Sequence, residues 1–268
     1  MTTKIYLYSI IIVSIFVFAC KDFDLDEIQD ETQYLRLNST TQLGHVETGF
    51  YFEYDSSGHL SSFKRAFEDE YTIQKEVITN EDGYVESIVD CPINSNATGP
   101  ATDTSLVIYE GSLIKKITYV NQYGYPNYFE FTYDSDNRIK TLRHITGAFG
   151  ENAFKEYAFT YTGNNVTRID EHRNNDGVIS QEIYTLLKYD NNPNPYILLD
   201  EKYYPFLLDW IRHYPISENN VIEVKRQFLG EDEPQFGSIK NYIYGAGGYP
   251  ETSYLLDPEI IDILYSYE

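Results

Sequence analysis

The sequence predicts an all-β protein: a long, twisted antiparallel meander of about eight hairpin repeats, curled or partly closed, with one short helical insertion. Three observations lead to this fold: a high share of Tyr, alternation of apolar and polar residues, and turn sequences that recur along the chain. The 268 residues include 27 Tyr but one Trp and one Met. Tyr favours the half-buried surface of a pleated sheet, because its ring packs while its hydroxyl reaches water.

The clearest hairpin spans residues 128–145. Its first strand, Tyr-Phe-Glu-Phe-Thr-Tyr, shows the period of two that is typical of a half-buried strand. The stretch from Asp134 to Asn137 supplies the turn, since short polar side chains accept left-handed backbone and cap their own amides. The returning strand then runs from Arg138 to Ile145.

Similar units recur along the chain, which predicts a repeat protein of hairpins. The first strand of each unit ends about 24 to 30 residues after the previous one, at Tyr54, Thr79, Tyr109, Tyr133, Tyr161, Tyr189, Tyr214 and Tyr244. The connections between units are also turn-like, so neighbours in sequence are expected to pair without crossovers. About sixteen strands cannot form a flat open sheet, and the sheet is expected to curl, split or close.

A second regularity follows the turns, where two apolar residues lie three positions apart. The pairs are Leu60/Phe63, Val85/Ile88, Ile114/Ile117, Ile139/Leu142, Val166/Ile169 and Val221/Val224. A flat strand would put such residues on opposite faces. Either the first residue still belongs to the turn, or a β-bulge lies between the two residues and adds twist to the sheet. Both alternatives let the two side chains enter one core.

Two segments interrupt the repeats. Residues 91–105 form a loop rich in Asn, Thr, Gly and Pro, and residues 193–215 contain the helical insertion. Pro205 suits the first turn of a short helix, because its fixed φ matches the helix and its missing N–H costs nothing there. The apolar side chains of this helix are Phe206, Leu207, Trp210 and Ile211. The insertion is expected to plug the concave side of the sheet or to cap it.

The first residues predict export and lipidation. Residues 1–19 read as a lipoprotein signal peptide: Lys4 is followed by an apolar run that is too short to span a membrane comfortably. The run ends at Cys20 in Val-Phe-Ala-Cys, which resembles a bacterial lipobox and predicts that this Cys is lipidated. The alternatives are an ordinary secretory signal, or an anchor helix in which the Cys is incidental. Residues 20–33 form an acidic tether, and 34–268 are predicted to form a single domain.

The Tyr-Asp units of the sequence resemble a known kind of repeat. The units around Tyr54-Asp55 and Tyr133-Asp134 resemble YD (RHS-type) repeats. With the lipobox, they are similar to a Bacteroidota lipoprotein family of unknown function with degenerate YD-like hairpins, over roughly residues 34 to 268. This resemblance implies a β-rich lipoprotein of the envelope and transfers no catalytic residues. The repeat period is longer than in RHS proteins and the Gly-Arg pair after the turn is mostly absent, so encapsulation is not carried over.

Charge and motif content exclude several functions. The net charge of −22 argues against nucleic acid and against electrostatic docking on anionic lipid. After lipidation only Cys91 remains, the five His residues are dispersed, and no metal or cofactor motif appears. We therefore expect no catalytic residue, no cofactor and no metal. The rival class is a carboxylate-based hydrolase of envelope glycans, although so acidic a chain contains carboxylate pairs by chance. A purely structural role is the third alternative.

The irregular segment supplies the candidate ligand-binding residues, because Tyr and Trp rings can stack on sugar rings. The candidates are Tyr203, Tyr204, Trp210 and Tyr214, and the alternative for all four is packing in the core. The leading prediction is a non-catalytic outer-membrane lipoprotein, exposed at the cell surface or facing the periplasm. It would bind a glycan or an envelope protein through the β-repeat surface, and its lipid would hold it to the membrane.

Overall fold

A computed structural model describes most of the chain, and Arg36–Glu268 form one compact unit. The described residues are 35–42, 48–67, 71–92, 104–120, 124–147, 153–175, 178–211, 216–228, 231, 236–245, 247–255 and 261–267. The predicted signal peptide, Cys20 and the acidic tether lie outside the described residues. Within the described part, no helix is both long and apolar enough to cross a bilayer.

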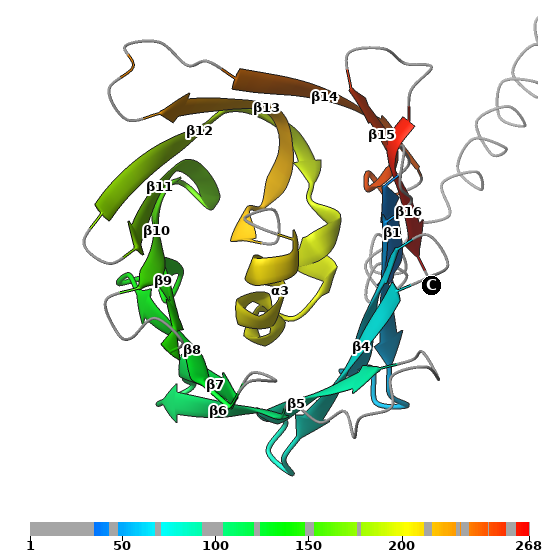
Figure 1. Cartoon of the computed structure of the whole chain (residues 1–268). Helices are drawn as coiled ribbons and strands as arrows, with labels where there is room; N and C mark the ends of the chain where they lie inside the picture. The colour runs from blue at the N-terminus through cyan, green and yellow to red at the C-terminus, as the bar shows by residue number, and fades with distance from the viewer. Residues whose placement is uncertain are drawn as a thin grey trace, which may run out of the picture. The chain divides into compact units, whose positions relative to one another are not determined.

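The described residues form sixteen strands that pair antiparallel in sequence order (Figure 1). They are β1 (Leu37–Gln42), β2 (Thr48–Tyr54), β3 (Leu60–Phe67), β4 (Tyr71–Thr79), β5 (Val85–Pro92), β6 (Thr104–Glu110), β7 (Leu113–Val120), β8 (Pro126–Tyr133), β9 (Ile139–Thr146), β10 (Phe154–Thr162), β11 (Asn165–Asn175), β12 (Val178–Pro193), β13 (Asn219–Phe228), β14 (Phe236–Tyr244), β15 (Pro250–Leu255) and β16 (Ile261–Tyr267). β1 pairs with both β2 and β16, so the meander closes into a barrel. The predicted all-β antiparallel meander is confirmed, and its curl is complete.

The bulge alternative is confirmed by the strand register. In the hairpin of β8 and β9, Tyr133 pairs with Ile139 while Thr132 pairs with Thr141, so Lys140 is the extra residue of a bulge. Ile139 and Leu142 therefore both face the interior and are 6% and 4% exposed. The same shift directly precedes Tyr54, Thr79, Tyr109 and Tyr161 in the hairpins that begin with β2, β4, β6 and β10. The repeated bulges add twist to the sheet, which favours closure.

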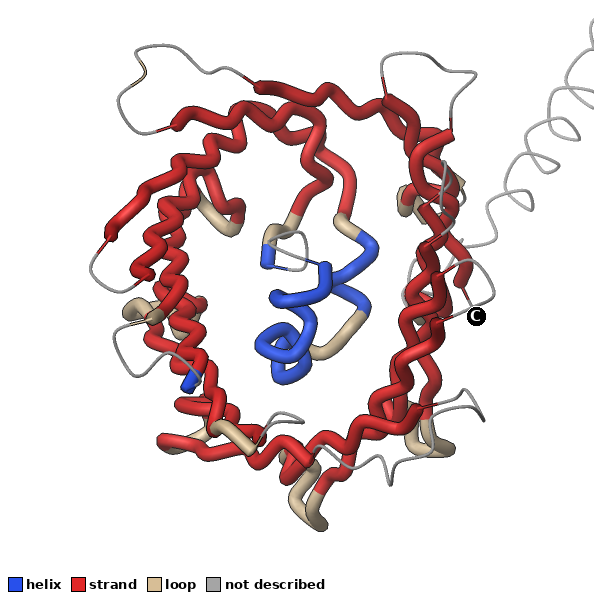
Figure 2. The backbone as a smooth tube through the Cα atoms, in the orientation of Figure 1, coloured by secondary structure: helices blue, strands red, loops and turns tan. Residues whose placement is uncertain are grey.

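The helical insertion lies between β12 and β13 and runs through the interior of the barrel (Figure 2). It contains two 3₁₀ turns, η2 (Pro195–Leu198) and η3 (Glu201–Tyr203), followed by α3 (Tyr204–Ile211), with Pro205 in the first turn. Leu199 and Leu207 are fully buried and join the core of the barrel. The expected short insertion on the concave side is therefore present, and it fills part of the interior.

One expected hairpin is wrong. Tyr189 and Tyr214 were predicted to end the first strands of two separate hairpins, but Tyr189 pairs with Val221, so β12 and β13 form a single hairpin. The insertion, which includes Tyr214, separates its two strands, and Tyr214 itself lies outside the described residues. The turn residues after Tyr189 mislead because they start the insertion instead of a hairpin turn. The eighth antiparallel pair is β16 with β1.

Candidate functional site

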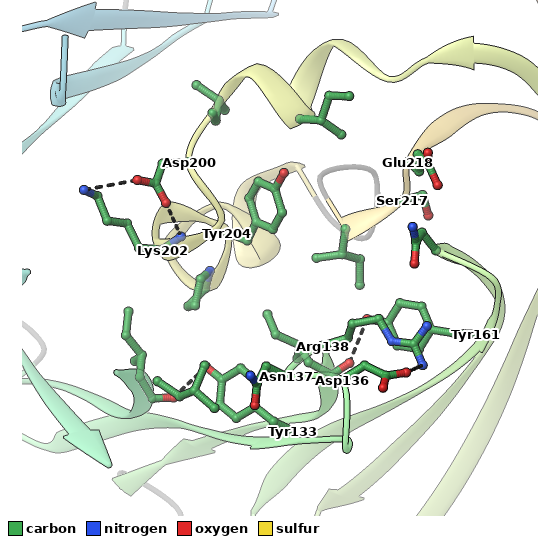
Figure 3. A pocket seen from close by; sticks show the side chains of 18 of the residues that line it. Tyr133, Asp136, Asn137, Arg138, Tyr161, Asp200, Lys202, Tyr204, Ser217 and Glu218 are labelled. Carbon is green, nitrogen blue, oxygen red and sulfur yellow. Dashed lines mark hydrogen bonds and ion pairs between the residues drawn. The ribbon is translucent and has the colours of Figure 1, made fainter. Parts of the chain in front are cut away.

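A cleft of about 940 Å³ lies between the insertion and three neighbouring hairpins, those of β6–β7, β8–β9 and β10–β11 (Figure 3). Its hairpin side is at the barrel end formed by the tight turns, which we call the turn end. The lining comes from Ser112, Leu113, Ile114, Tyr133, Asp136, Asn137, Arg138, Ile139, Tyr161 and Asn164 of the hairpins, and from Ile197, Leu199, Asp200, Lys202, Tyr204, Pro205, Ile216, Ser217 and Glu218 of the insertion. The cleft is therefore a contact zone between repeated and irregular parts of the chain.

The turn between β8 and β9 forms the hairpin wall of the cleft. One carboxylate oxygen of Asp134 accepts hydrogen bonds from the backbone N–H groups of Asp136 and Arg138, at 2.9 and 3.0 Å. Asn137 has a left-handed backbone with φ of 61°, which Asn tolerates better than most residues. The local sequence thus fixes the turn, and the fixed turn places the Asp136 and Asn137 side chains at the cleft.

Arg138 is held rigidly at the floor of the cleft. Its Nε donates to Asp134 Oδ2 at 2.8 Å, and one terminal nitrogen donates to the Gly163 carbonyl at 2.5 Å. Its guanidinium also lies 4.5 Å from the centre of the Tyr161 ring. Burial pushes the pKa of the Asp134 carboxyl upward, but the hydrogen bonds from Arg138 and the turn amides outweigh it and hold that pKa below its ordinary value. The pair stays ionised at neutral pH and fixes the distance between adjacent turns.

The insertion wall is fastened to the barrel by buried amides. Asn194 caps η2 through a bond from the Tyr196 N–H at 3.1 Å, and its Nδ2 donates to the Ser217 carbonyl at 2.9 Å. The Ser217 hydroxyl accepts from the Val166 N–H at 3.2 Å. Asn194 and Ser217 are both buried. The two ends of the insertion are thus tied to one another and to β11.

The charges that line the cleft are mostly paired with one another. Lys202 lies 3.2 Å from Asp200 on the insertion, and Arg138 lies 3.2 Å from Asp136 on the hairpin side. Glu218 is exposed at the rim, and it makes no ion pair with the described residues. The cleft therefore presents fixed donors and acceptors with little net charge to a ligand.

This arrangement is suited to binding a neutral, hydroxyl-rich molecule. Such a ligand can bond to the carboxylates, the ammonium and the amides, while the rings of Tyr133, Tyr161 and Tyr204 supply apolar contact. In the described part of the chain, no group of His, Cys, Asp and Glu side chains is arranged to hold a metal ion. Of the three carboxylates that line the cleft, Asp136 and Asp200 are each paired with a cation of the cleft, which leaves Glu218 alone for acid–base catalysis.

The four ligand-binding residues predicted from the sequence differ in where the structure places them. Tyr204 lines the cleft, whereas its neighbour Tyr203 is 2% exposed and belongs to the core, as the packing alternative expected. The side chain of Trp210 and the whole of Tyr214 lie outside the described residues, as does Cys20. Sequence reasoning missed Asp136, Arg138, Asp200 and Lys202. The only sequence signal for them was their position in or beside a turn.

No protein-family model matches the chain, and no curated protein matches it. Among solved structures, a porin-like protein from Bacteroides uniformis is similar, with a TM-score of 0.55 and 10% sequence identity over 86% of this chain and 96% of that one. A porin-like protein from Bacteroides vulgatus aligns with a TM-score of 0.39 and 14% identity over 87% of this chain and 98% of that one. At this identity, the first of these likenesses shows a shared fold.

Proposed function

We propose that this chain is a non-catalytic, lipid-anchored protein of the cell envelope that binds a glycan in the cleft at the turn end. The observation that carries the proposal is the chemistry of the cleft: three Tyr rings surround polar groups whose charges are largely paired with one another. Sugars present hydroxyl groups together with apolar C–H faces, and the cleft offers partners for both. The alternative ligand is a loop of an envelope protein.

The envelope location rests on two supports. The first is the predicted signal peptide and lipobox, which ends at Cys20. The second is the fold shared with a porin-like protein of Bacteroides uniformis. Both agree with the resemblance to Bacteroidota lipoproteins with YD-like repeats, which remains a prediction.

The charges on the outer wall of the barrel support the proposal that a lipid attaches the protein to the membrane. Cross-strand ion pairs lie on outward faces, such as Lys64 with Glu53, Lys116 with Glu130 and Lys188 with Glu223. Each Lys on the lipid face of a spanning barrel costs about 2 to 4 kcal/mol at the middle of the bilayer. The buried apolar residues form a cluster in the interior that includes residues of the insertion, while single apolar side chains such as Leu106, Ile108 and Ile243 are exposed. We infer that water surrounds the barrel and that the lipid on Cys20 supplies the membrane contact.

The rival function, a carboxylate-based hydrolase, would need two carboxylates free to act as acid and as base or nucleophile. Asp136 and Asp200 are both in ion pairs with cations of the cleft. Each would have to give up its partner to take part in catalysis. We therefore place glycan binding ahead of glycan hydrolysis. The experiment described next distinguishes the two functions.

The test is native affinity electrophoresis of the full-length protein in mild detergent, through gels that contain a panel of neutral polysaccharides. We expect one glycan to retard the protein, and we expect Tyr204→Ala to abolish most of the retardation. The matched control is Tyr51→Ala, which removes an exposed ring from the outer wall. Uniform mobility on every glycan, or equal retardation of both variants, would refute binding in the cleft. Release of new reducing ends from the retarding glycan would favour the hydrolase.

A further inference from the structure

Tyrosine hydroxyls join neighbouring hairpins of the barrel by a regular rule. A Tyr near the end of the first strand of one hairpin donates to a backbone carbonyl near the start of the second strand of the preceding hairpin. Tyr109 of β6 donates in this way to Val85 of β5 at 2.9 Å, and Tyr161 of β10 donates to Ile139 of β9 at 2.8 Å. Counting β16 with β1 as the eighth hairpin, seven of the eight supply such a hydroxyl within the described residues, from Tyr54, Tyr109, Tyr133, Tyr161, Tyr189, Tyr242 and Tyr267.

The exception is the hairpin of β4 and β5, where Thr79 holds the position of the Tyr. Thr79 pairs with Val85 after a shift in register, as Tyr109 pairs with Ile114 in the next hairpin. By the rule, residue 79 would donate to the carbonyl of Leu60, the first residue of β3. A Thr side chain lacks the ring that carries the hydroxyl across to the neighbouring strand. The Leu60 carbonyl therefore has no tyrosine to serve it at this end of β4.

A tyrosine of the insertion is buried in the same core. Tyr203 is 2% exposed, although Lys202 and Tyr204 on either side of it line the cleft (Figure 3). Leu60 is also 2% exposed and belongs to the same hydrophobic cluster as Tyr203. The Tyr203 hydroxyl is buried, and among the described residues it has no partner at normal hydrogen-bond geometry. A buried hydroxyl without a partner costs stability, so the place of this one calls for an explanation.

The surroundings of the Tyr203 hydroxyl place it beside Leu60. Burial, followed by the Asp200 carboxylate, raises the pKa of Tyr203 to about 12, while a close approach of the Leu60 backbone lowers it. Backbone groups that meet the hydroxyls of Tyr109 and Tyr133 lower the pKa of those tyrosines in the same way. The approach of Tyr203 to Leu60 falls short of the geometry of the seven regular bonds, but it involves the residue that the rule leaves unserved.

We propose that Tyr203 takes the place of the tyrosine that β4 lacks, and that this attachment holds the insertion wall of the cleft in position. Thr79 leaves the room that the Tyr203 ring occupies. The ends of the insertion are tied to one another through Asn194 and Ser217, and Tyr203 attaches its middle to β3. Tyr204 follows directly and lines the cleft, so fixing Tyr203 also fixes Tyr204. The attachment follows from the repeats alone, whereas its effect on binding rests on the proposed function.

The test compares the full-length protein in mild detergent with its Tyr203→Phe variant, which loses only the hydroxyl, by two readouts that need no ligand. Circular dichroism during urea unfolding follows the barrel. Acrylamide quenching of tryptophan fluorescence follows the insertion, because Trp210 of α3 is the only Trp in the chain. We expect a lower urea midpoint and stronger quenching in Tyr203→Phe. The matched control is Tyr51→Phe on the outer wall, which should change neither readout.

A second set of variants tests whether one tyrosine can replace the other. Tyr203→Ala removes the ring as well as the hydroxyl and should lower the urea midpoint further. Adding Thr79→Tyr to Tyr203→Ala should restore most of the midpoint, because the new tyrosine of β4 can itself bond to Leu60. Quenching of Trp210 should remain strong in this double variant, since the insertion is still unattached. Adding Thr79→Phe in place of Thr79→Tyr supplies the ring without the hydroxyl and should restore less.

The outcomes separate the attachment from the proposed function. Equal midpoints and equal quenching for Tyr203→Phe and Tyr51→Phe overturn the attachment, as does equal restoration by Thr79→Tyr and Thr79→Phe. These results leave glycan binding in the cleft untouched, because neither readout uses a glycan.

Affinity gels with the panel of neutral polysaccharides test the positioning role. We expect Tyr203→Phe to reduce the retardation that the unaltered protein shows. Unchanged retardation together with stronger quenching keeps the attachment and overturns the positioning role. If no polysaccharide retards the unaltered protein, the proposed function and the positioning role are both refuted, while the attachment of Tyr203 stands on the unfolding and quenching results.

Discussion

The hydroxyl of Tyr133 donates a hydrogen bond to the backbone carbonyl of Ile114, which lies 2.8 Å away in the preceding hairpin. Ile114 directly precedes the bulge of that hairpin, where the ladder of backbone bonds is interrupted. The same contact recurs around the barrel, in the pairs Tyr54–Leu37, Tyr109–Val85, Tyr161–Ile139, Tyr189–Val166, Tyr242–Val221 and Tyr267–Pro250. A Tyr hydroxyl therefore couples each of these strands to a neighbouring hairpin. In β14 this Tyr is Tyr242, whereas Tyr244, which ends the strand, donates to Asp190.

Removing one of these hydroxyls should cost measurable stability. In Tyr133→Phe the ring remains, but the buried carbonyl of Ile114 loses its partner, so we expect a loss of about 1 to 3 kcal/mol in the free energy of unfolding. The measurement is urea unfolding followed by tyrosine fluorescence or circular dichroism. Tyr51→Phe, on the outer wall, is the matched control and should change stability by less than about 0.5 kcal/mol. Equal midpoints for the two variants would show that the contact contributes nothing to the barrel.

The same tyrosines make the barrel sensitive to alkali. Burial raises the pKa of Tyr109, Tyr133 and Tyr189 each to about 12, from an ordinary value of 10.0. The folded state thus favours the neutral phenol, and this contribution to stability is complete below pH 10 and lost as the pH rises through about 12. We expect the urea midpoint to fall steeply between these values, and absorbance at 295 nm to show tyrosines that ionise only on unfolding. The slope should become shallower in Tyr133→Phe, and an unchanged slope would contradict the assignment.

Local sequence was enough to predict most of the strands and turns, and it left two alternatives for the apolar pairs that follow the turns. The spacing of Ile139 and Leu142 by three positions required a bulge or a longer turn, and the register selected the bulge. The role of the Tyr hydroxyls was not predictable in the same way. Tyr133 and Ile114 are 19 residues apart, and only the pairing of β7 with β8 brings them together.

The cleft was less predictable than the fold, because it joins distant segments. Asp136 belongs to a hairpin turn and Asp200 to the insertion, and no periodic pattern relates them. Neighbouring residues also differ: Tyr203 is buried while Tyr204 lines the cleft. The 3₁₀ turn ends and the helix begins between them, so their side chains diverge. The expected hairpin at Tyr214 failed for a related reason, since turn-forming residues also suit the start of an insertion.

The attachment of the insertion to the barrel should control both stability and binding. Asn220, which is 3% exposed, donates through its side-chain amide to Asp190 at 3.3 Å and to the carbonyls of Asn192 and Pro193 at 3.1 Å each. In Asn220→Ala these acceptors lose a shared donor, and we expect a loss of about 2 kcal/mol in the free energy of unfolding. Asn241→Ala, on the outer face of β14, is the control and should be neutral.

The same variant should weaken glycan binding in the cleft without touching any residue of its lining. The insertion supplies one wall, and a loosened wall must be ordered again when a ligand binds, which lowers affinity. Retardation in affinity gels should therefore fall, and limited proteolysis should cut within the insertion faster than in the Asn241→Ala protein. If proteolysis speeds up while retardation by the glycan stays constant, the insertion does not form a wall of the binding site, and the ligand must be held by the hairpin turns alone.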